Sequence, residues 1–152
     1  MKTINLTVQE KRDYCACSVL QAILRRNGRE MSQEEIASNL TRGKNDDGRG
    51  EGYIVHDDKI KKFMKSLGFD YLYFGAHSTP FNEPDELLKE MCEHDGLIGI
   101  GDHVYLLRGF ENWTVKLIDP KNGKEIEKDY VGMIREMGHG GIFSLVKSLG
   151  TS

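Results

Sequence analysis

The strongest constraint on the fold is that helical and β patterns occupy separate parts of the sequence. Before Gly96, apolar residues mostly recur at intervals of three and four, as they do on one face of a helix. After Gly96, short apolar runs bounded by turn residues predict strands at residues 97–100, 103–110, 114–118 and 141–146. Helices followed by a sheet are typical of an α+β domain with an antiparallel sheet, and not of a doubly wound parallel sheet.

Several helices are expected in the N-terminal part. Their markers are, in chain order, the apolar face of residues 15–24 closed by Gly28, the capping-box pair Ser32 and Glu35, the apolar face of residues 60–67, and Pro84. A short strand is predicted at residues 71–74. Residues 41–52 carry four glycines and no apolar period, which predicts a loop that serves either as a substrate lid or as a plain connection.

Length and composition favour one globular domain that covers residues 1–152. The chain is 38% hydrophobic and 30% charged with a net charge of -3, which argues against a dedicated nucleic-acid binder. No apolar run approaches the ~20 residues of a membrane span, and residues 1–10 lack an apolar signal-peptide core. Three cysteines, an odd number, indicate reduced thiols. We therefore expect a cytoplasmic protein without a membrane span.

Cys15 is the first candidate for chemistry because it lies in the first turn of a predicted helix. A thiolate is the reactive form of cysteine, and a helix N-terminus stabilises it. The backbone N–H of Cys15 could also donate a hydrogen bond to a developing oxyanion. Gln9 lies six positions earlier, so its side-chain amide could supply a second donor if the intervening residues form a turn.

A base and a residue to orient it are found in the β part of the sequence. His103 begins one predicted strand, and Asp119 follows the end of the next. In an antiparallel hairpin the start of one strand and the end of the next lie at the same edge of the sheet. We therefore expect the Asp119 carboxylate to contact the His103 imidazole.

These residues together resemble the papain-like peptidases related to the double-glycine leader-processing domains of bacteriocin transporters. The matching features are Gln9 with five residues before Cys15, the small residues Ala16 and Ser18, the strand His103-Val-Tyr-Leu-Leu, and Asp119-Pro120 sixteen positions after the histidine with Gly123 beyond. The resemblance spans about residues 9–123. The chain departs from the family pattern because Cys15 is not followed by glycine and Cys17 lies two residues on.

The resemblance implies a papain-like cysteine peptidase that cleaves a peptide bond. Cys15 would be the nucleophile, His103 its base, Asp119 the residue that fixes the imidazole tautomer, and Gln9 an oxyanion donor. The partner would be a peptide or protein substrate, including a glycine-containing leader. The same chemistry serves an amidase, a deamidase or a transglutaminase-like acyl transferase, and an inactive relative would be a peptide-binding module.

Other cysteine and histidine residues have simpler interpretations. Cys15 and Cys17 could begin a zinc site, but no second closely spaced ligand pair follows, so neither a metal nor a cofactor is expected. Cys17 and Cys92 are interpreted as packing residues. The remaining histidines and Trp113 are left outside the predicted site; these histidines are His56, His77, His94 and His139.

Overall fold

The computed structural model describes residues 4–44, 51–76 and 84–150. Its helices are α1 (Cys15–Arg26), α2 (Gln33–Ala37), α3 (Asp58–Ser66), α4 (Pro84–Glu93), α5 (Tyr130–Met137) and the 3-10 turn η1 (Gly138–Gly140). Its strands are β1 (Arg42–Lys44), β2 (Glu51–Tyr53), β3 (Phe69–Gly75), β4 (Asp95–Ile100), β5 (His103–Glu111), β6 (Thr114–Ile118), β7 (Glu125–Asp129) and β8 (Ile142–Ser148).

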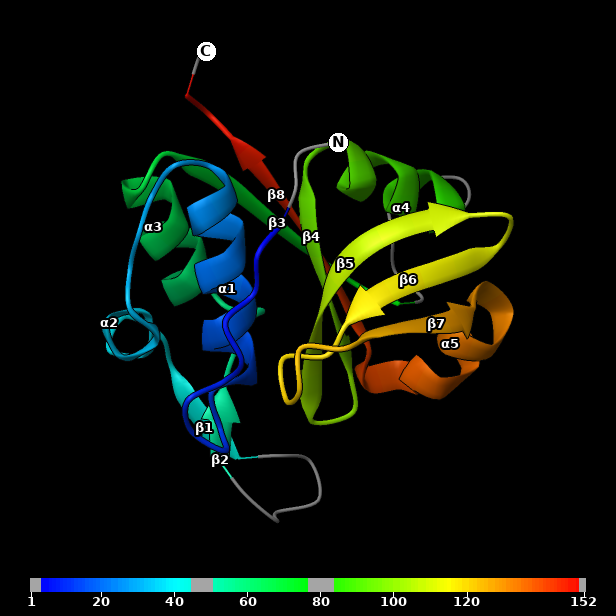
Figure 1. Ribbon diagram of the computed structural model, residues 1–152, viewed down its shortest axis with the longest axis horizontal. Coiled ribbons are helices and arrows are strands. Elements are labelled where there is room, and N and C mark those ends of the chain that lie inside the picture. The colour runs from blue at the N-terminus through cyan, green and yellow to red at the C-terminus, as the bar shows by residue number, and fades with distance from the viewer. Residues whose placement is uncertain (1–3, 45–50, 77–83, 151–152) are drawn as a thin grey trace.

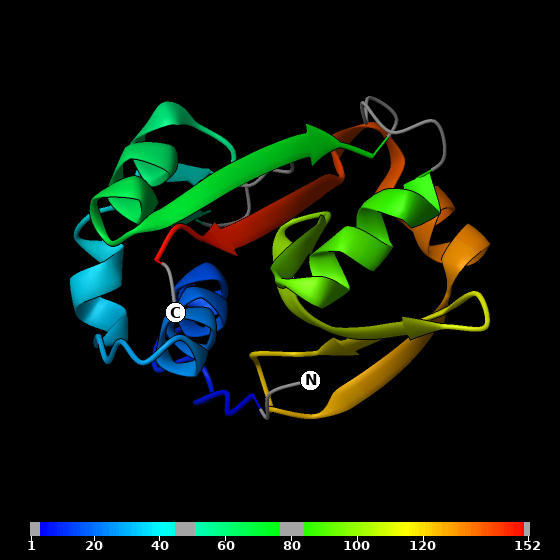
Figure 2. The same ribbon diagram turned by 90° about the horizontal axis from the view of Figure 1, so that it is seen from above.

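The described residues form a six-stranded sheet in the order β3-β8-β4-β5-β6-β7, in which each neighbouring pair is antiparallel. Figure 1 shows α1, α2 and α3 together on one side of the molecule, with α4 and α5 on the other, and Figure 2 shows the same arrangement from above. The strands β1 and β2 form a separate two-stranded sheet beside α1 and α2. The predicted α+β class with an antiparallel sheet is therefore confirmed.

The central strands of the sheet are buried on both faces, and their successive residues contribute to two different cores. Leu97 of β4 and Leu106 of β5 pack in the core under α1, α2 and α3. Their neighbours Ile98 and Leu107 pack in the core under α4 and α5. Every residue of β4 is buried, which explains why this strand reads as a continuous apolar run and not as an alternating one.

The predicted helices are all present, and the capping residue of the second one acts as expected. The Ser32 hydroxyl accepts a hydrogen bond from the Glu35 backbone N–H at 3.1 Å and so begins α2. All predicted strands are present as well, with ends that differ by at most two residues. Among the described residues, no helix is long and apolar enough to cross a membrane.

The loop predicted at residues 41–52 is wrong at both of its ends. Arg42–Lys44 and Glu51–Tyr53 pair as the antiparallel strands β1 and β2, while residues 45–50 lie outside the described part of the chain. No apolar alternation marks these two strands, because five of their six residues are glycine or charged. Tyr53 faces the Tyr14 ring edge-on at 5.7 Å, so packing on the start of α1 stabilises this hairpin.

Candidate active site

Cys15 is the first residue of α1 and lies at the edge of the helical core. The preceding residue, Tyr14, makes no side-chain capping hydrogen bond to the described first turn. The Cys15 residue is 9% exposed, whereas Cys17 is completely buried. Burial, with added repulsion from Cys15 and Asp13, raises the pKa of the Cys17 thiol to about 12. Cys17 is therefore a packing residue that stays protonated.

His103 is positioned by a tight turn between β4 and β5. Ile100 pairs with His103 across this hairpin, so two residues make the turn. The first of them, Gly101, has φ 61, a conformation that glycine adopts without steric cost. The turn holds His103 at the very start of β5, half-buried, with its ring edge-on to Tyr105 at 4.6 Å between centroids.

Asp119 follows β6 and is held by the turn that leads to β7. His103 Nε2 and Asp119 Oδ1 lie 2.7 Å apart, so the structure brings these two predicted residues together. The same carboxylate oxygen accepts a hydrogen bond from the Lys121 N–H at 2.9 Å. The Asp119 carbonyl accepts another from the Gly123 N–H at 2.7 Å, and Gly123 has φ 75. Backbone hydrogen bonds thus hold the Asp119 carboxylate in the place where it contacts the imidazole.

Cys15 and Asp119 act on the two sides of the His103 ring. Burial alone would lower the pKa of His103, but hydrogen bonds and charge interactions with Cys15 and Asp119 outweigh it and raise the pKa above its usual 6.5. Asp119 contacts Nε2, which leaves Nδ1 as the ring nitrogen available to the thiol. The protonated ring is favoured in the folded state. Its contribution to stability is full below about pH 6.5 and is lost as the pH rises through the raised pKa.

Gln9 lies in the segment before α1, and its amide is directed at the turn that leads into the helix. Nε2 donates to the carbonyl oxygens of Lys11 and Arg12 at 3.0 Å and 2.8 Å. Oε1 is buried and has no hydrogen-bond partner among the described residues. The backbone N–H of Gln9 donates to the Pro120 carbonyl at 2.9 Å. The structure therefore ties Gln9 to the Asp119 turn but does not place its side chain along the cavity described next.

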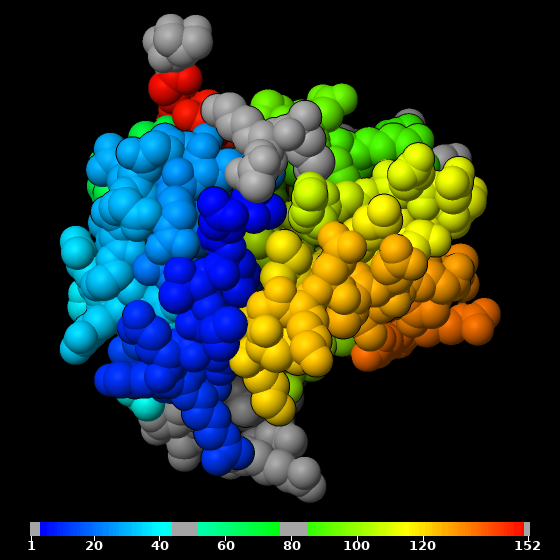
Figure 3. Space-filling model, in the orientation of Figure 1, coloured from blue at the N-terminus to red at the C-terminus, as the bar shows by residue number. Residues whose placement is uncertain are grey.

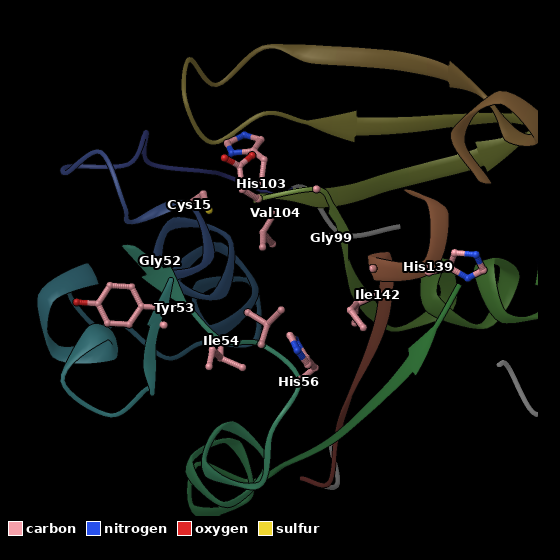
Figure 4. Close-up of a pocket in the computed structure, with 15 residues that line it drawn as sticks. Cys15, Gly52, Tyr53, Ile54, His56, Gly99, His103, Val104, His139 and Ile142 are labelled. Carbon is pink, nitrogen blue, oxygen red and sulfur yellow. The ribbon is translucent and has the colours of Figure 1, made fainter. Parts of the chain in front are cut away.

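A cavity of about 310 Å³ opens beside Cys15 and His103. Figure 4 shows these two side chains next to each other, with His56 and His139 farther along the cavity. The β1–β2 hairpin contributes Gly43, Gly52 and Tyr53 to its wall, and the sheet contributes Gly99. The cleft thus lies between the helical part and the sheet.

Sequence reasoning missed part of this wall. His56 and His139 come from a loop and from η1, and no spacing in the sequence links them to Cys15. The glycines of the wall lie in strands or turns that look ordinary one at a time. Within the described ranges, no group of three or more histidine, cysteine, aspartate or glutamate side chains could hold a metal ion.

Comparison with known proteins gives matches among solved structures. No protein-family model and no curated protein matches the sequence. The crystal structure of a double glycine motif protease from an AMS/PCAT transporter, in complex with the leader peptide, superposes with a TM-score of 0.67 at 16% identity over 97% of this chain and 93% of that one. The peptidase domain of Streptococcus ComA, a bi-functional ABC transporter involved in quorum sensing, gives 0.66 at 16% identity over 94% and 97%.

Each superposition covers almost all of this chain and almost all of the solved chain. At this level of identity the likeness establishes the fold. The chain therefore has the papain-like fold of these peptidase domains, and the predicted structural resemblance is confirmed.

Proposed function

We propose that this chain is a cysteine peptidase in which Cys15 is the nucleophile, His103 the general base and Asp119 the residue that orients the base. The observation that carries the proposal is the contact chain from Cys15 through His103 to Asp119 at the wall of a cavity. The shared fold with two peptidase domains supports it. A nucleophile, a base and an orienting carboxylate in this order are the parts that acyl transfer requires.

In the proposed reaction Nδ1 of His103 exchanges protons with the reacting groups, while Nε2 stays hydrogen-bonded to Asp119. Nδ1 accepts the Cys15 proton, and the thiolate attacks the scissile carbonyl carbon, whose oxygen becomes an oxyanion. The imidazolium then gives its proton to the leaving amine as the C–N bond breaks, which leaves an acyl-enzyme thioester. Water, deprotonated by His103, attacks the thioester and releases the acid and the Cys15 thiol. Asp119 holds the Nε2 proton throughout.

The oxyanion would be held by the backbone N–H of Cys15 and by Gln9 Nε2. Two neighbouring carbonyl oxygens, those of Lys11 and Arg12, accept from this nitrogen. One amide hydrogen shared between both carbonyls, a three-centre bond, leaves the second hydrogen for the oxyanion. On this reading, Gln9→Ala lowers kcat on the order of 10²-fold to 10³-fold.

The proposed substrate is a peptide or protein that enters as an extended, glycine-containing segment. The double glycine motif protease was solved with a leader peptide, which makes a leader the first candidate. Strand and turn glycines line the described wall, among them Gly99 and Gly101, so the backbone of a small-residue segment can come close. All three cysteines are free thiols, which supports a cytoplasmic location.

The mechanism is tested by the rate of iodoacetamide alkylation at Cys15 across pH, with the modified residue identified by mass spectrometry. We expect Cys15 to react well below about pH 8.5, where an ordinary thiol is mostly protonated, and Cys17 and Cys92 to stay unmodified. His103→Ala should remove the advantage at low pH, because the imidazolium no longer stabilises the thiolate. An equal, slow rate in both proteins would exclude the Cys15–His103 pair.

A second measurement separates the peptidase from a peptide-binding module. The engagement of Gln9 Nε2 by two backbone carbonyls is the observation that favours the module. An acetyl-Gly-Gly coumarin amide should be hydrolysed by the wild type and not by Cys15→Ala. If the wild type binds the peptide and its Cys15 is alkylated rapidly, but no hydrolysis occurs, the chain is a binding module or an acyl transferase that needs an amine acceptor.

A further inference from the structure

An N-terminal strap, residues 4–10, runs between the helical part and the sheet. Figures 1 and 3 show this dark-blue segment along α1, in contact with the turn that follows β6. Gln9 N–H donates to the Pro120 carbonyl, one residue after Asp119. Ser18 Oγ, in α1, donates to the Thr7 carbonyl at 2.6 Å. The strap therefore touches both the helix of the nucleophile and the turn of the orienting carboxylate.

Gln33, the first residue of α2, holds the strap on both sides of Gln9. Its side chain is completely buried. Nε2 donates to the Thr7 and Val8 carbonyls at 3.2 Å and 3.1 Å, and Oε1 accepts from the Glu10 N–H at 2.9 Å. Gln33 therefore holds the residues on both sides of Gln9, which the proposed function makes a hydrogen-bond donor to the oxyanion.

A second buried glutamine fixes which way the Gln33 amide points. Gln21 of α1 donates from Nε2 to the Met31 carbonyl at 3.1 Å, and its Oε1 accepts from Gln33 Nε2 at 3.0 Å. The Met31 carbonyl can only accept and the Glu10 N–H can only donate. Both amides are therefore restricted to one orientation, because turning either of them would set like groups against each other in a buried site.

We infer that Gln33 is a positioning residue, which sets the place of the Gln9 amide relative to Cys15 and is itself oriented by Gln21. The inference rests on the proposed function, since Gln33 would act only by positioning Gln9, the proposed oxyanion donor. An apolar side chain would fill the same space in the helical core with less desolvation. The buried amides hold the strap instead, and their bonds bracket the Gln9 position.

The test compares Gln33→Met, Gln9→Ala and the double variant with the wild type in two assays. Inhibition by the aldehyde acetyl-Gly-glycinal forms a thiohemiacetal and therefore reports on the oxyanion site. Alkylation by iodoacetamide needs the Cys15–His103 pair but forms no oxyanion. We expect Gln33→Met to weaken aldehyde inhibition about tenfold, and Gln9→Ala to weaken it about 100-fold. The double variant should equal Gln9→Ala, and the alkylation rate should stay within about twofold throughout.

A matched variant controls for the loss of a structural hydrogen bond. Asn27, at the other end of α1, donates to the Ile23 carbonyl and to Asp95 Oδ2 at 2.8 Å and 3.0 Å. Asn27→Ala should lower Tm and leave aldehyde inhibition unchanged. If Gln33→Met does not fold, Gln21→Met removes only the contact that orients Gln33, and we expect a smaller loss of about threefold.

The outcomes separate a failure of the positioning role of Gln33 from a failure of the proposed peptidase function. Losses that multiply in the double variant, or an alkylation rate that falls with aldehyde affinity, would show that Gln33 is only structural. Aldehyde inhibition unchanged in Gln33→Met or Gln21→Met would also reject the inference while leaving the peptidase intact. If Cys15 of the wild type is not alkylated faster than an ordinary thiol, the proposed function fails and the inference fails with it.

Discussion

At the scale of single residues, position along one helix separates two cysteines that the sequence presents as near equals. Cys15 and Cys17 lie two residues apart in α1, but one side chain reaches the cavity and the other is sealed in the core. Burial raises the pKa of Cys17 to about 12, so it remains a neutral thiol. Any reactivity at neutral pH should therefore be confined to Cys15, next to an imidazole whose own pKa is raised by that contact and by Asp119.

Gly99 offers a single-residue test of the glycine-lined wall. It lies on β4, and the atoms nearest to a Cβ added there belong to Ile142, the first at an ordinary 3.7 Å. Gly99→Val should therefore fold normally and place its methyl groups in substrate space. We expect KM for acetyl-Gly-Gly coumarin amide to rise about tenfold, with Tm nearly unchanged, because the added bulk excludes the peptide.

The control for Gly99→Val is Gly109→Val. Gly109 lies on β5 away from the cavity, and a Cβ there meets only the Lys116 side chain at 3.9 Å. This variant should leave KM unchanged. Equal KM values for both variants and the wild type would show that Gly99 does not face the bound peptide.

At the scale of elements, the sequence predicts what local periodicity encodes and misses what tertiary contacts create. The hairpin from His103 to Asp119 was predictable, because strand order alone places a strand start beside the next strand's end. The sequence EIEKD of β7 was missed because only Ile126 provides an apolar side chain, as befits an edge strand.

The missed helix and the Gln9 side chain show the same limit. α5 was missed because Gly132 interrupts its pattern, although Asp129 caps it by accepting from the Gly132 N–H at 3.0 Å. The engagement of the Gln9 amide by carbonyl oxygens was equally out of reach. The strap that carries it is set by Gln33, 24 positions along the chain, and no local pattern encodes such a contact.

The junction between α5 and β8 gives a prediction at this scale. Gly141 precedes β8 with ordinary backbone angles, φ -73 and ψ 143. A Cβ there would overlap the Met137 Cβ and lie 3.1 Å from the Met137 Cα, which are atoms at the end of α5 that cannot swing away. We expect Gly141→Ala to lower the free energy of unfolding by about 2 kcal/mol.

Urea denaturation measures the effect of Gly141→Ala. Gly109→Ala serves as the control, since its added Cβ touches only a flexible lysine side chain. A midpoint for Gly141→Ala equal to that of the control would mean that the end of α5 gives way and does not fix the start of β8.

At the scale of the whole molecule, one sheet is the common wall of two cores. The core under α1, α2 and α3 and the core under α4 and α5 share strands β4 and β5, whose successive side chains enter opposite sides. The proposed active site forms where the first residue of α1 meets this sheet. We therefore propose that residues 1–152 form a single domain, since neither core can lose its wall without exposing the other.

The single-domain proposal predicts that a destabilising substitution in one core lowers the unfolding midpoint of both cores equally. Leu20 of α1 is completely buried under the sheet, and Leu20→Ala should lower the free energy of unfolding by about 2–5 kcal/mol. Trp113, the only tryptophan, reports from the distant β5–β6 turn, where its ring packs on Tyr130 at 5.6 Å. In urea, the unfolding midpoints measured by far-UV circular dichroism and by Trp113 fluorescence should fall to the same lower value.

The control is Val131→Ala, at an exposed site on α5, which should change neither midpoint. If the fluorescence midpoint stayed at its wild-type value while the dichroism midpoint fell, the sheet with α4 and α5 would be a separate folding unit.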